Sequence, residues 1–475
     1  MIDTSNTSTR REFLGNTASF AAAAVVFPQI VPRHVIGGVG HTPPSETVYV
    51  AGIGVGGMGG IDVRISNYRG AKIAALCDVN QRQAAAIFEG FPDATKYKDY
   101  RVLLEKEKGI DAVIIGTPDH SHAIISMAAM QLGKHVYCEK PLAHTLHEIR
   151  TVTEGARSYG VVTQMGNQGR SFKSIEGFNA CIRSGAIGQV REVHVVEQGH
   201  SACRIKELHR LEKKFAVPEG LDWDLWLGPM PYRDYNPVYL PGNWRGWRQF
   251  GSGMLGDWVC HLVDPVFLAL DLGAPTSIIA EAEGYDLVKH KETFPESTKV
   301  RYEFPARGDR PLVTVYWYDG EYYNPPRPEE IEEGEEFIPV PEAGWSNKKP
   351  FGAMVVGDAG KILYGSHGAT GWRILDEEKM KDYEGGRKDQ KDAEITGLSG
   401  GEAHHQNWLD ACKGNGTTVS NFDYAGGLSE IAQLGNVALR MPGTKLHWDA
   451  ETMTFPGNPE AEEYLQIPYR EGWTL

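Results

Sequence analysis

The stretch GIGVGGMG, residues 52–59, stands between an aliphatic run and a helical pattern. It matches the pattern G-x-G-x-x-G through Gly54, Val55, Gly56, Gly57, Met58 and Gly59, and Gly52 begins an overlapping match. Glycines permit a tight turn and let a pyrophosphate approach the N-terminus of the next helix, where unpaired N–H groups favour an anion. The stretch therefore predicts a dinucleotide-binding turn.

An acidic residue follows at the distance that such a site requires. Asp78 ends the second aliphatic run, 19 residues after Gly59, where a carboxylate hydrogen-bonds a ribose 2′-hydroxyl. A carboxylate would repel a 2′-phosphate, so the sequence favours NAD over NADP. Arg82 lies nearby and keeps NADP open as an alternative.

Short aliphatic runs alternate with helical patterns on both sides of this turn. The runs that read as buried strands are residues 47–54, 71–79, 111–117, 135–140 and 161–166. Strands that alternate with helices indicate a parallel, doubly wound sheet. We therefore expect an NAD-binding Rossmann domain over residues 47–166.

The pattern changes after residue 166, where strand signals follow one another with few helices between them. These signals are residues 190–198, 277–283, 297–304, 311–318 and 353–358. They predict a largely antiparallel sheet in an α+β domain of residues 167–475. Late helices are expected near 402–413 and 424–441, packing back on the first domain.

Composition excludes several classes of partner. The 475 residues carry a formal net charge of −14 without a dense stripe of Lys and Arg, which argues against nucleic acid and anionic membrane surfaces. The six cysteines form no C-x-x-C pair, so a zinc ribbon is not expected and neither is a structural disulfide.

The first residues have the layout of an export signal. STRREFLG, residues 8–15, contains the twin arginines Arg10 and Arg11, and a moderately apolar run follows from Ala18 to Ile30. That run is too short for a permanent membrane span. We expect residues 1–42 to be a twin-arginine signal and disordered leader, so the protein is exported, to the periplasm for instance; a cytoplasmic protein is the alternative.

The stretch GDWVCHLVD, residues 256–264, reads as a buried helix with three polar side chains. Asp257, His261 and Asp264 lie at i, i+4 and i+7, on one helical face. Burying an unpaired carboxylate is costly, so the face needs an explanation. A metal site, a satisfied polar cluster and an acid–base pair remain open on the residues alone.

The segment TPDHSHAIISMAAMQLGKHVYCEKPLA, residues 117–143, indicates a particular family of proteins. Together with the glycine turn, it resembles the Gfo/Idh/MocA oxidoreductases, the glucose–fructose oxidoreductase and inositol dehydrogenase family. The resemblance covers nearly all of residues 47–475. The motifs LDWDLWLGP (221–229), NWRGW (243–247) and LHWDAETMTF (446–455) resemble the exported branch found in Planctomycetes and Bacteroidetes.

The resemblance implies a Rossmann domain followed by an open, mainly antiparallel sheet that covers the nicotinamide. It implies that Lys140 of the Glu-Lys-Pro triplet stabilises a developing alkoxide and that His261 exchanges a proton with a sugar hydroxyl. Asp257 would orient His261. The family works without a required metal, so no metal is expected.

Further residues are assigned to the two ligands. The expected cofactor contacts beyond the turn and Asp78 are Thr117, Pro118, His122, Glu139, Lys140 and Asn167. The expected substrate contacts are Gln168, Trp244, Arg245, Asp264 and His404. Trp244 and Trp247 suit a sugar face or an aromatic core equally well.

The resulting hypothesis is an NAD(P)-dependent oxidoreductase that acts on a hydroxyl of a sugar, glycoside or cyclitol. The cofactor is expected to stay tightly bound. Two alternatives are a redox-assisted glycosidase or lyase and a non-catalytic NAD-binding partner protein. Tyr316, Trp317 and Tyr318 alternate on a strand of the open sheet, so we expect a homodimer or homotetramer packed through that sheet.

Overall fold

Six parallel strands form the first sheet of the computed structural model, which describes residues 46–332, 351–383 and 400–475. In spatial order, the strands are β3 (Thr95–Tyr97), β2 (Lys72–Cys77), β1 (Tyr49–Ile53), β4 (Ala112–Ile115), β5 (His135–Cys138) and β6 (Thr163–Met165). The chain order reverses between β1 and β4, and ligands bind at such a switch point. The predicted Rossmann sheet is confirmed, while the predicted signal of residues 1–42 lies outside the described residues.

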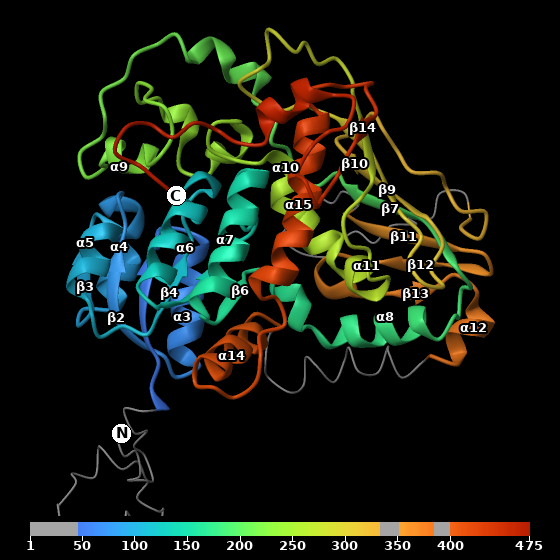
Figure 1. The fold of residues 1–475 in the computed structure, drawn as a ribbon, viewed down its shortest axis with the longest axis horizontal. Coiled ribbons are helices and arrows are strands. Elements are labelled where there is room, and N and C mark those ends of the chain that lie inside the picture. The colour runs from blue at the N-terminus through green and yellow to red at the C-terminus, as the bar shows by residue number, and fades with distance from the viewer. Residues whose placement is uncertain (1–45, 333–350, 384–399) are drawn as a thin grey trace, which may run out of the picture. The chain divides into compact units, whose positions relative to one another are not determined.

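Helices cover both faces of this sheet, which explains why its strands are almost wholly apolar. The helices of this part are α3 (Met58–Tyr68), α4 (Gln81–Gly90), α5 (Tyr100–Lys106), α6 (His122–Gln131) and α7 (Leu146–Tyr159). Apolar side chains of α5, α6 and α7 pack on one face and those of α3 and α4 on the other. The helices are blue to cyan in Figure 1.

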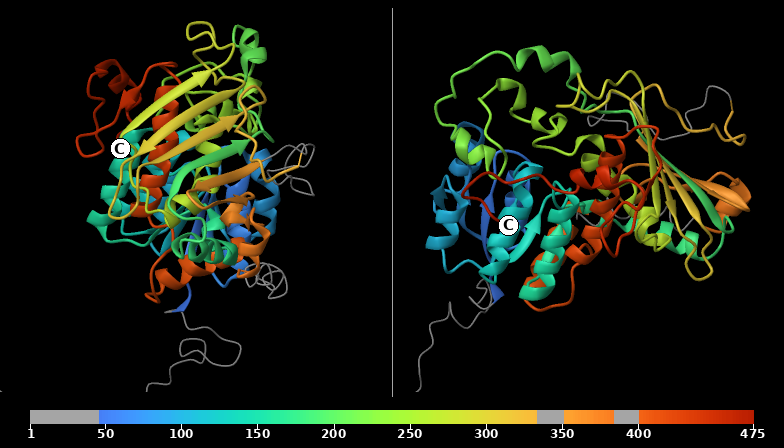
Figure 2. Two further views of the ribbon diagram at one scale, coloured as in Figure 1. Left: turned by 90° about the vertical axis from the view of Figure 1, so that its right-hand side faces the viewer. Right: turned by 45° about the horizontal axis from the view of Figure 1, so that its top comes forward.

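Eight strands form the second sheet (Figure 2). In spatial order they are β13 (Arg373–Ile374), β12 (Gly360–Tyr364), β11 (Phe351–Gly357), β7 (Val190–Glu197), β10 (Val313–Asp319), β9 (Thr298–Phe304), β8 (Ser277–Ala282) and β14 (Leu446–His447). Only the β7–β10 pair is parallel among these strands. The predicted, mainly antiparallel sheet is confirmed.

The two faces of the second sheet differ. Trp317 of β10 is fully buried on the face covered by helices, whereas Tyr316 and Tyr318 point the other way and stack with His194 of β7. Tyr318 and His194 are themselves buried. The outer face is therefore less exposed than the alternating aromatics suggested, since neighbouring side chains cover its centre.

The segment between β7 and the next long helix crosses to the first sheet. It contains η4 (Ile205–Arg210), α9 (Trp223–Leu227), η5 (Pro237–Tyr239) and η6 (Asn243–Gly246), and is followed by α10 (Gly253–Leu262) and α11 (Asp264–Ala269). Its aromatic side chains form a separate core that includes Trp223, Trp226, Tyr239, Trp247 and Phe250. Figure 1 shows α9 above the ends of the first strands.

The later helices return to the first domain. They are α14 (Gly400–Cys412) and α15 (Phe422–Ala438). The elements of the chain not yet named are η2 (Asp119–Ser121), η3 (Gln168–Ser171), α8 (Lys173–Arg183), η7 (His367–Ala369), α12 (Glu377–Lys381) and η8 (Pro459–Tyr464). Gln164 of β6 donates to the His404 carbonyl, and Arg150 of α7 pairs with Glu430 of α15. Within the described ranges, no helix combines the length and apolar character needed to cross a membrane.

Candidate functional site

The glycine turn after β1 leaves no room for side chains where it bends. Gly54 has a φ of +77°, and a Cβ there would lie 2.7 Å from the backbone nitrogen of Thr117. A Cβ on Gly59 would lie 2.3 Å from the Gly54 carbonyl oxygen. In contrast, a Cβ on Gly57 would meet nothing within 4 Å. The turn is therefore tight against the protein and open towards the first turn of α3.

Asp78 joins the end of β2 to this turn. Its carboxylate accepts hydrogen bonds from the backbone nitrogens of Gly56 at 2.9 Å and Asn80 at 2.8 Å. Burial raises the pKa of Asp78 to about 6, although those backbone donors oppose the rise. Arg82 is exposed, lies 3.8 Å from Glu219, and does not border the cavity described below. The geometry leaves Asp78, not Arg82, facing a ribose.

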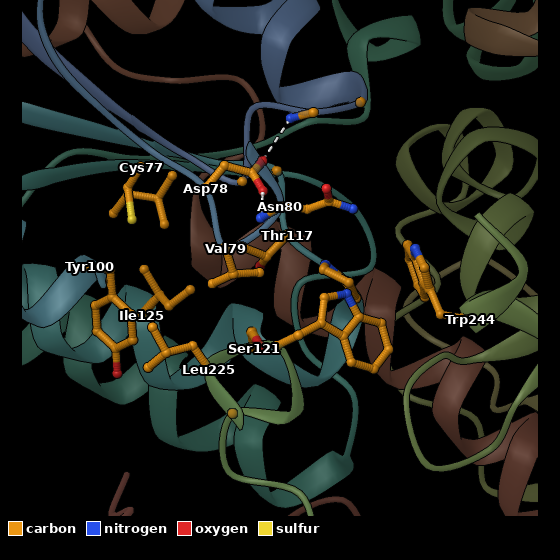
Figure 3. Close-up of a pocket in the computed structure, with 18 of the residues that line it drawn as sticks. Cys77, Asp78, Val79, Asn80, Tyr100, Thr117, Ser121, Ile125, Leu225 and Trp244 are labelled. Atoms are coloured by element: carbon orange, nitrogen blue, oxygen red, sulfur yellow. Dashed lines mark hydrogen bonds between the residues drawn. The ribbon is translucent and has the colours of Figure 1, made fainter. Parts of the chain in front are cut away.

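A cavity of about 350 Å³ extends from the glycine turn along the carboxyl edge of the first sheet. The predicted cofactor residues that border it are Gly54, Gly56, Gly57, Met58, Asp78, Thr117, Pro118, Glu139 and Lys140. Val55 and Gly59 lie within the turn without bordering the cavity. Figure 3 shows Tyr100, Ile125 and Leu225 on one side of the cavity and Trp244 on the other.

Two residues that border this region contain buried polar atoms without a partner. The Thr117 hydroxyl and one oxygen of Glu139 are buried and have no hydrogen-bond partner. Burial raises the pKa of Glu139 well above its usual range. The open glycine turn and Asp78 suit a dinucleotide, which supplies a phosphate at the turn and a ribose hydroxyl beside the carboxylate.

Sequence reasoning missed one end of the cavity. Trp473, two residues before the end of the sequence, borders the cavity beside Tyr100, and their ring centroids lie 6.5 Å apart. The guanidinium of Arg101 lies 4.6 Å from the Trp473 ring. Arg470 fixes the segment by donating to the Gly228 carbonyl at 2.7 Å. No pattern in the sequence could connect residue 473 with α5, because only folding brings them together.

Lys140 lies at the other end, directly after β5. Its ammonium donates to the Asp257 backbone carbonyl at 2.8 Å and to the Asp257 carboxylate at 2.5 Å. Arg245 reaches the same carboxylate at 3.2 Å. Burial pushes the pKa of Asp257 upward, but Lys140 and Arg245 outweigh burial and hold that pKa well below its usual range. Asp257 is thus ionised and paired.

This pairing corrects the expected role of Asp257. Its hydrogen bonds go to Lys140 and Arg245, which are both cations, and none is formed with His261. A second carboxylate completes the group, because Asp119 borders the cavity and accepts from the Ser252 backbone at 2.9 Å. Asp119 was not predicted, although it stands within the TPDHSH segment. We call Lys140, Arg245, Asp257 and Asp119 the charged quartet.

His261 is buried on α10, one turn after Asp257. Its Nδ1 has no hydrogen-bond partner, and its ring centroid lies 4.0 Å from that of His367. Burial, followed by His367 and Lys140, lowers the pKa of His261 well below its usual value. The imidazole is therefore neutral near pH 7. Like Asp257, His261 does not itself border the cavity, whereas Lys140 does. His367, which no motif singled out, is brought beside it by η7.

Asp264 does not share the helical face of Asp257 and His261. The helix α10 ends at Leu262, and Asp264 begins α11, with Pro265 as the next residue. The Tyr424 hydroxyl donates to the buried Asp264 carboxylate, and burial raises the pKa of Asp264 to about 7. Asp264 is bonded within the protein and does not border the cavity, so its contact with a substrate stays a prediction.

Two predicted histidines are engaged by the protein itself. His122 lies between the carbonyl oxygens of Pro141 and Thr117, each 2.8 Å from a ring nitrogen. His404 contacts the Ser171 hydroxyl at 2.7 Å and the Met165 carbonyl at 2.8 Å. Both rings are buried and neither borders the cavity. The predicted contacts of His122 to the cofactor and of His404 to the substrate therefore stay predictions.

The remaining predicted residues divide between cavity and core. Trp244 and Arg245 border the cavity, with the Arg245 guanidinium 4.3 Å from the Trp244 ring centre. Trp247 is fully buried in the aromatic core. Asn167 and Gln168 follow β6 with unpartnered buried amide atoms but do not border the cavity, so their roles stay predictions. In the part of the chain that the structure describes, no three His, Cys, Asp or Glu side chains are grouped to hold a metal ion.

Comparison with known proteins adds an independent line of evidence. Residues 48–167 match the Gfo/Idh/MocA oxidoreductase family, NAD-binding Rossmann fold, and residues 175–307 match its C-terminal alpha/beta domain. The chain is 32% identical over 246 residues to inositol 2-dehydrogenase of Salmonella typhimurium, which covers 50% of this chain and 68% of the relative. It is 30% identical over 190 residues to levoglucosan dehydrogenase of Pseudarthrobacter phenanthrenivorans, covering 40% of each chain.

Solved structures share the fold. The inositol dehydrogenase homologue of Azotobacter vinelandii, complexed with NADH and myo-inositol, superimposes with a TM-score of 0.55 at 17% identity over 85% of this chain and 98% of its own. The WlbA dehydrogenase of Bordetella pertussis, in complex with NADH and UDP-GlcNAcA, gives a TM-score of 0.57 at 13% identity over 85% and 98%. At these identities the likeness concerns the fold alone.

Proposed function

Because the chain belongs to the Gfo/Idh/MocA oxidoreductase family, we propose that it transfers a hydride between NAD and a hydroxyl-bearing carbon of a sugar, glycoside or cyclitol. The observation that carries the proposal is Lys140, which is paired with Asp257 and borders the cavity that begins at the glycine turn. The relatives named for inositol and levoglucosan as substrates support this substrate class.

The charged quartet prepares the site for this reaction. NAD, when bound, supplies the hydride acceptor or donor. Asp257 holds the Lys140 ammonium in place, so that the ammonium stabilises negative charge on the substrate oxygen. His261 is neutral near pH 7 and accepts the hydroxyl proton. Because Asp257 is paired with Lys140, it acts by positioning the ammonium instead of orienting His261.

The reaction can be tested with the purified, NAD-loaded protein and a panel of inositols, anhydrosugars, free sugars and glycosides. We expect at least one of them to increase the absorbance of reduced nicotinamide, and Lys140→Ala to abolish the increase. A protein that holds NAD in full but reduces it with no compound of the panel would contradict the proposed reaction.

The NAD is proposed to stay bound through many turnovers. Trp473 and Tyr100 border the cavity beside Leu225, and Arg470 ties the Trp473 segment to α9 through Gly228 and the carboxylate of Asp224. A ligand enclosed by such contacts dissociates slowly, because the segment must open first.

Substitution of the enclosing tryptophan tests this retention. We expect Trp473→Ala to release NAD about tenfold faster, as loss of one buried aromatic contact implies, with kcat nearly unchanged at saturating NAD. Tyr68→Ala, at an aromatic side chain that is 72% exposed, is the matched control. Equal release rates in both variants and the wild type would show that the segment does not retain the cofactor.

Export follows from the twin arginines Arg10 and Arg11 and the apolar run after them, again as a proposal. The twin-arginine route moves folded proteins, so NAD can be loaded before export. Without an external pool of NAD, each oxidation must be matched by a reduction in the same site. The test is extraction of mature protein from the periplasm, dialysis and acid precipitation. Near-stoichiometric NAD in the supernatant is expected, and protein found only in the cytoplasm would contradict export.

A homodimer or homotetramer through the second sheet is likewise proposed. The outer face presents the partly exposed Tyr316 between the buried rings of His194 and Tyr318. Beside them, Lys299 and Glu281 form an ion pair at 3.1 Å, which limits the apolar area. Light scattering at micromolar concentration tests the assembly, and a single monomeric species would contradict it.

A further inference from the structure

A second cavity, of about 230 Å³, lies between the end of α15 and the segment of residues 463–468. It shares no lining residue with the cofactor cavity. Gly251 and Ser252, just before α10, form one wall, and Arg248 and Arg440 form another part of the lining. None of the family motifs that led to the proposed function involves this cavity.

The two arginines have no carboxylate partner among the residues that the structure describes. Arg248 is only 6% exposed and donates to the Thr293 carbonyl at 2.6 Å and to the Tyr285 hydroxyl at 3.4 Å, both neutral groups. Its Nη1 donates to no described group. Arg440 contacts the ring of Tyr464, with its guanidinium 5.3 Å from the ring centre.

The charges of these arginines disfavour each other. Burial and, after it, the charge of Arg440 lower the pKa of Arg248 to about 10. Burial also lowers the pKa of Arg440. Glu292, which raises the pKa of Arg440 from a distance, is already paired with Arg233 at 2.7 Å. Glu463 borders the cavity at its exposed rim and forms no ion pair with either arginine in the described chain.

A buried cation is costly unless an anion compensates it. An oxyanion that accepts from the unused guanidinium donors would supply that compensation, and guanidinium groups match the geometry of carboxylates and phosphates. A further polar atom of the cavity lining also has no partner, because the amide oxygen of Asn436 is buried and accepts no hydrogen bond. This oxygen requires a hydrogen-bond donor, such as a hydroxyl group.

We propose that this cavity binds a small oxyanion, a carboxylate or a phosphate group, carried by a molecule that also has a hydroxyl group. Arg248 and Arg440 hold the oxyanion, and Asn436 accepts from the hydroxyl. The cavity size fits a molecule of a few carbon atoms, and is too small for a nucleotide. The site is separate from hydride transfer and does not depend on the proposed reaction.

The test measures the melting temperature of the protein saturated with NAD, so that the pyrophosphate site is already occupied. The probes are sodium glycerate, glycerol 3-phosphate and inorganic phosphate, with glycerol and potassium chloride of equal ionic strength as controls. We expect glycerate or glycerol 3-phosphate to raise Tm saturably, by about 2–4 °C at roughly a hundred times its Kd, and the two controls to have no such effect.

Two variants assign the effect to this cavity. Arg440→Met keeps an apolar side chain over Tyr464 and removes the charge, so it should weaken anion binding at least about tenfold. Gln466→Glu, at an exposed lining residue, adds a negative charge and should weaken it as well. Arg157→Met, at a surface arginine paired with Asp423, is the matched control and should bind as the wild type does.

The result has distinct outcomes for the two oxyanions. A response to glycerate alone assigns the site to carboxylates, and a response to the phosphates alone assigns it to phosphoryl compounds. A wild type in which no probe exceeds potassium chloride overturns the proposal. An equal response of Arg440→Met and the wild type also overturns it, because the effect would then arise elsewhere on the protein.

Discussion

Two groups of partly or fully buried cations border the two cavities, and they are compensated in opposite ways. In the charged quartet, Lys140 and Arg245 share the carboxylate of Asp257, and Asp119 lies close by. In the second cavity, Arg248 and Arg440 contact only neutral groups and aromatic rings.

In the first region the protein itself supplies the carboxylates that compensate its cations, whereas in the second region we propose that a ligand supplies the anion. Internal ion pairs fix side chains before a substrate arrives, and preorganised charge of this kind stabilises a transition state effectively. Uncompensated cations instead lower the stability of the folded protein until an anion binds. Charge balance thus distinguishes the proposed chemistry of the first region from the proposed binding of the second.

Removing the ammonium of the quartet should have the largest effect. We expect Lys140→Met to lower kcat by about 10²–10⁴-fold, because the developing negative charge on the substrate oxygen loses its stabilising partner. Steady-state kinetics with the substrate found in the panel measures this. Lys134→Met, at a half-buried lysine that contacts backbone carbonyls away from the cavity, is the control, and a normal rate in Lys140→Met would exclude the assigned role.

Removing the shared carboxylate should leave Lys140 and Arg245 with Asp119 as the remaining carboxylate of the quartet. We expect Asp257→Asn to lower the free energy of unfolding by about 2 kcal/mol, since the two partly buried cations Lys140 and Arg245 lose their shared partner. Urea denaturation measures the change. Asp224→Asn, whose carboxylate is largely exposed beside Arg470, should cost less than about 1 kcal/mol. Equal losses in the two variants would show that burial does not strengthen the quartet.

Asp264 differs from Asp257 because its buried carboxyl has no cation bonded to it, and this makes the stability of the protein depend on pH. Its pKa is raised to about 7 in the folded protein, against about 4 in an unfolded chain. Between these values the unfolded chain releases the proton and the folded protein keeps it, so stability falls as pH rises from about 4 to 7 and levels off above. Asp264→Asn should remove this part of the decline.

The measurement is Tm against pH for Asp264→Asn and the wild type. We expect the difference to grow in favour of the variant by a few degrees between about pH 4 and 7. Asp449→Asn is the control, because hydrogen bonding by Thr452 lowers the pKa of that exposed carboxyl and the sign is reversed. Parallel curves for Asp264→Asn and the wild type would contradict the raised pKa.

The smallest effect is expected at the second cavity in the absence of any oxyanion. Arg440→Met removes one of two charges that disfavour each other, so its Tm in chloride buffer should equal or slightly exceed that of the wild type. Arg150→Met, which leaves the buried Glu430 without its ion-pair partner, should lower Tm. A clear loss of Tm in Arg440→Met would mean that the protein itself compensates this arginine.

Local patterns were sufficient for the first sheet. The glycine turn, Asp78 and the Glu-Lys-Pro triplet each lie at the carboxyl end of a strand, where parallel strands meet at one edge. Their convergence on one cavity follows from the order of the strands, so Gly54, Asp78 and Lys140 could be placed from the sequence. The five strand signals of the second sheet also correspond to strands, because their apolar runs are long and bounded by turns.

The partners of buried polar side chains could not be predicted in this way. Asp257 and His261 have the spacing of a helical pair, yet Asp257 bonds to Lys140, 117 residues away. His122 and His404 appeared suited to ligands, but each ring is used by the surrounding backbone. Spacing reports which residues share a face and says nothing about the element that packs against it.

The sequence by itself determined the fold class, the dinucleotide turn and the position of Lys140 at the carboxyl end of a strand. Each of these follows from the pattern of residues within single strand–turn–helix units. Only the tertiary structure decided how charges are compensated. It brought Trp473 to the cofactor cavity, His367 to His261, and Arg248 to Arg440. Contacts between distant segments depend on the packing of whole elements, and the free energy of a buried charge depends on those contacts.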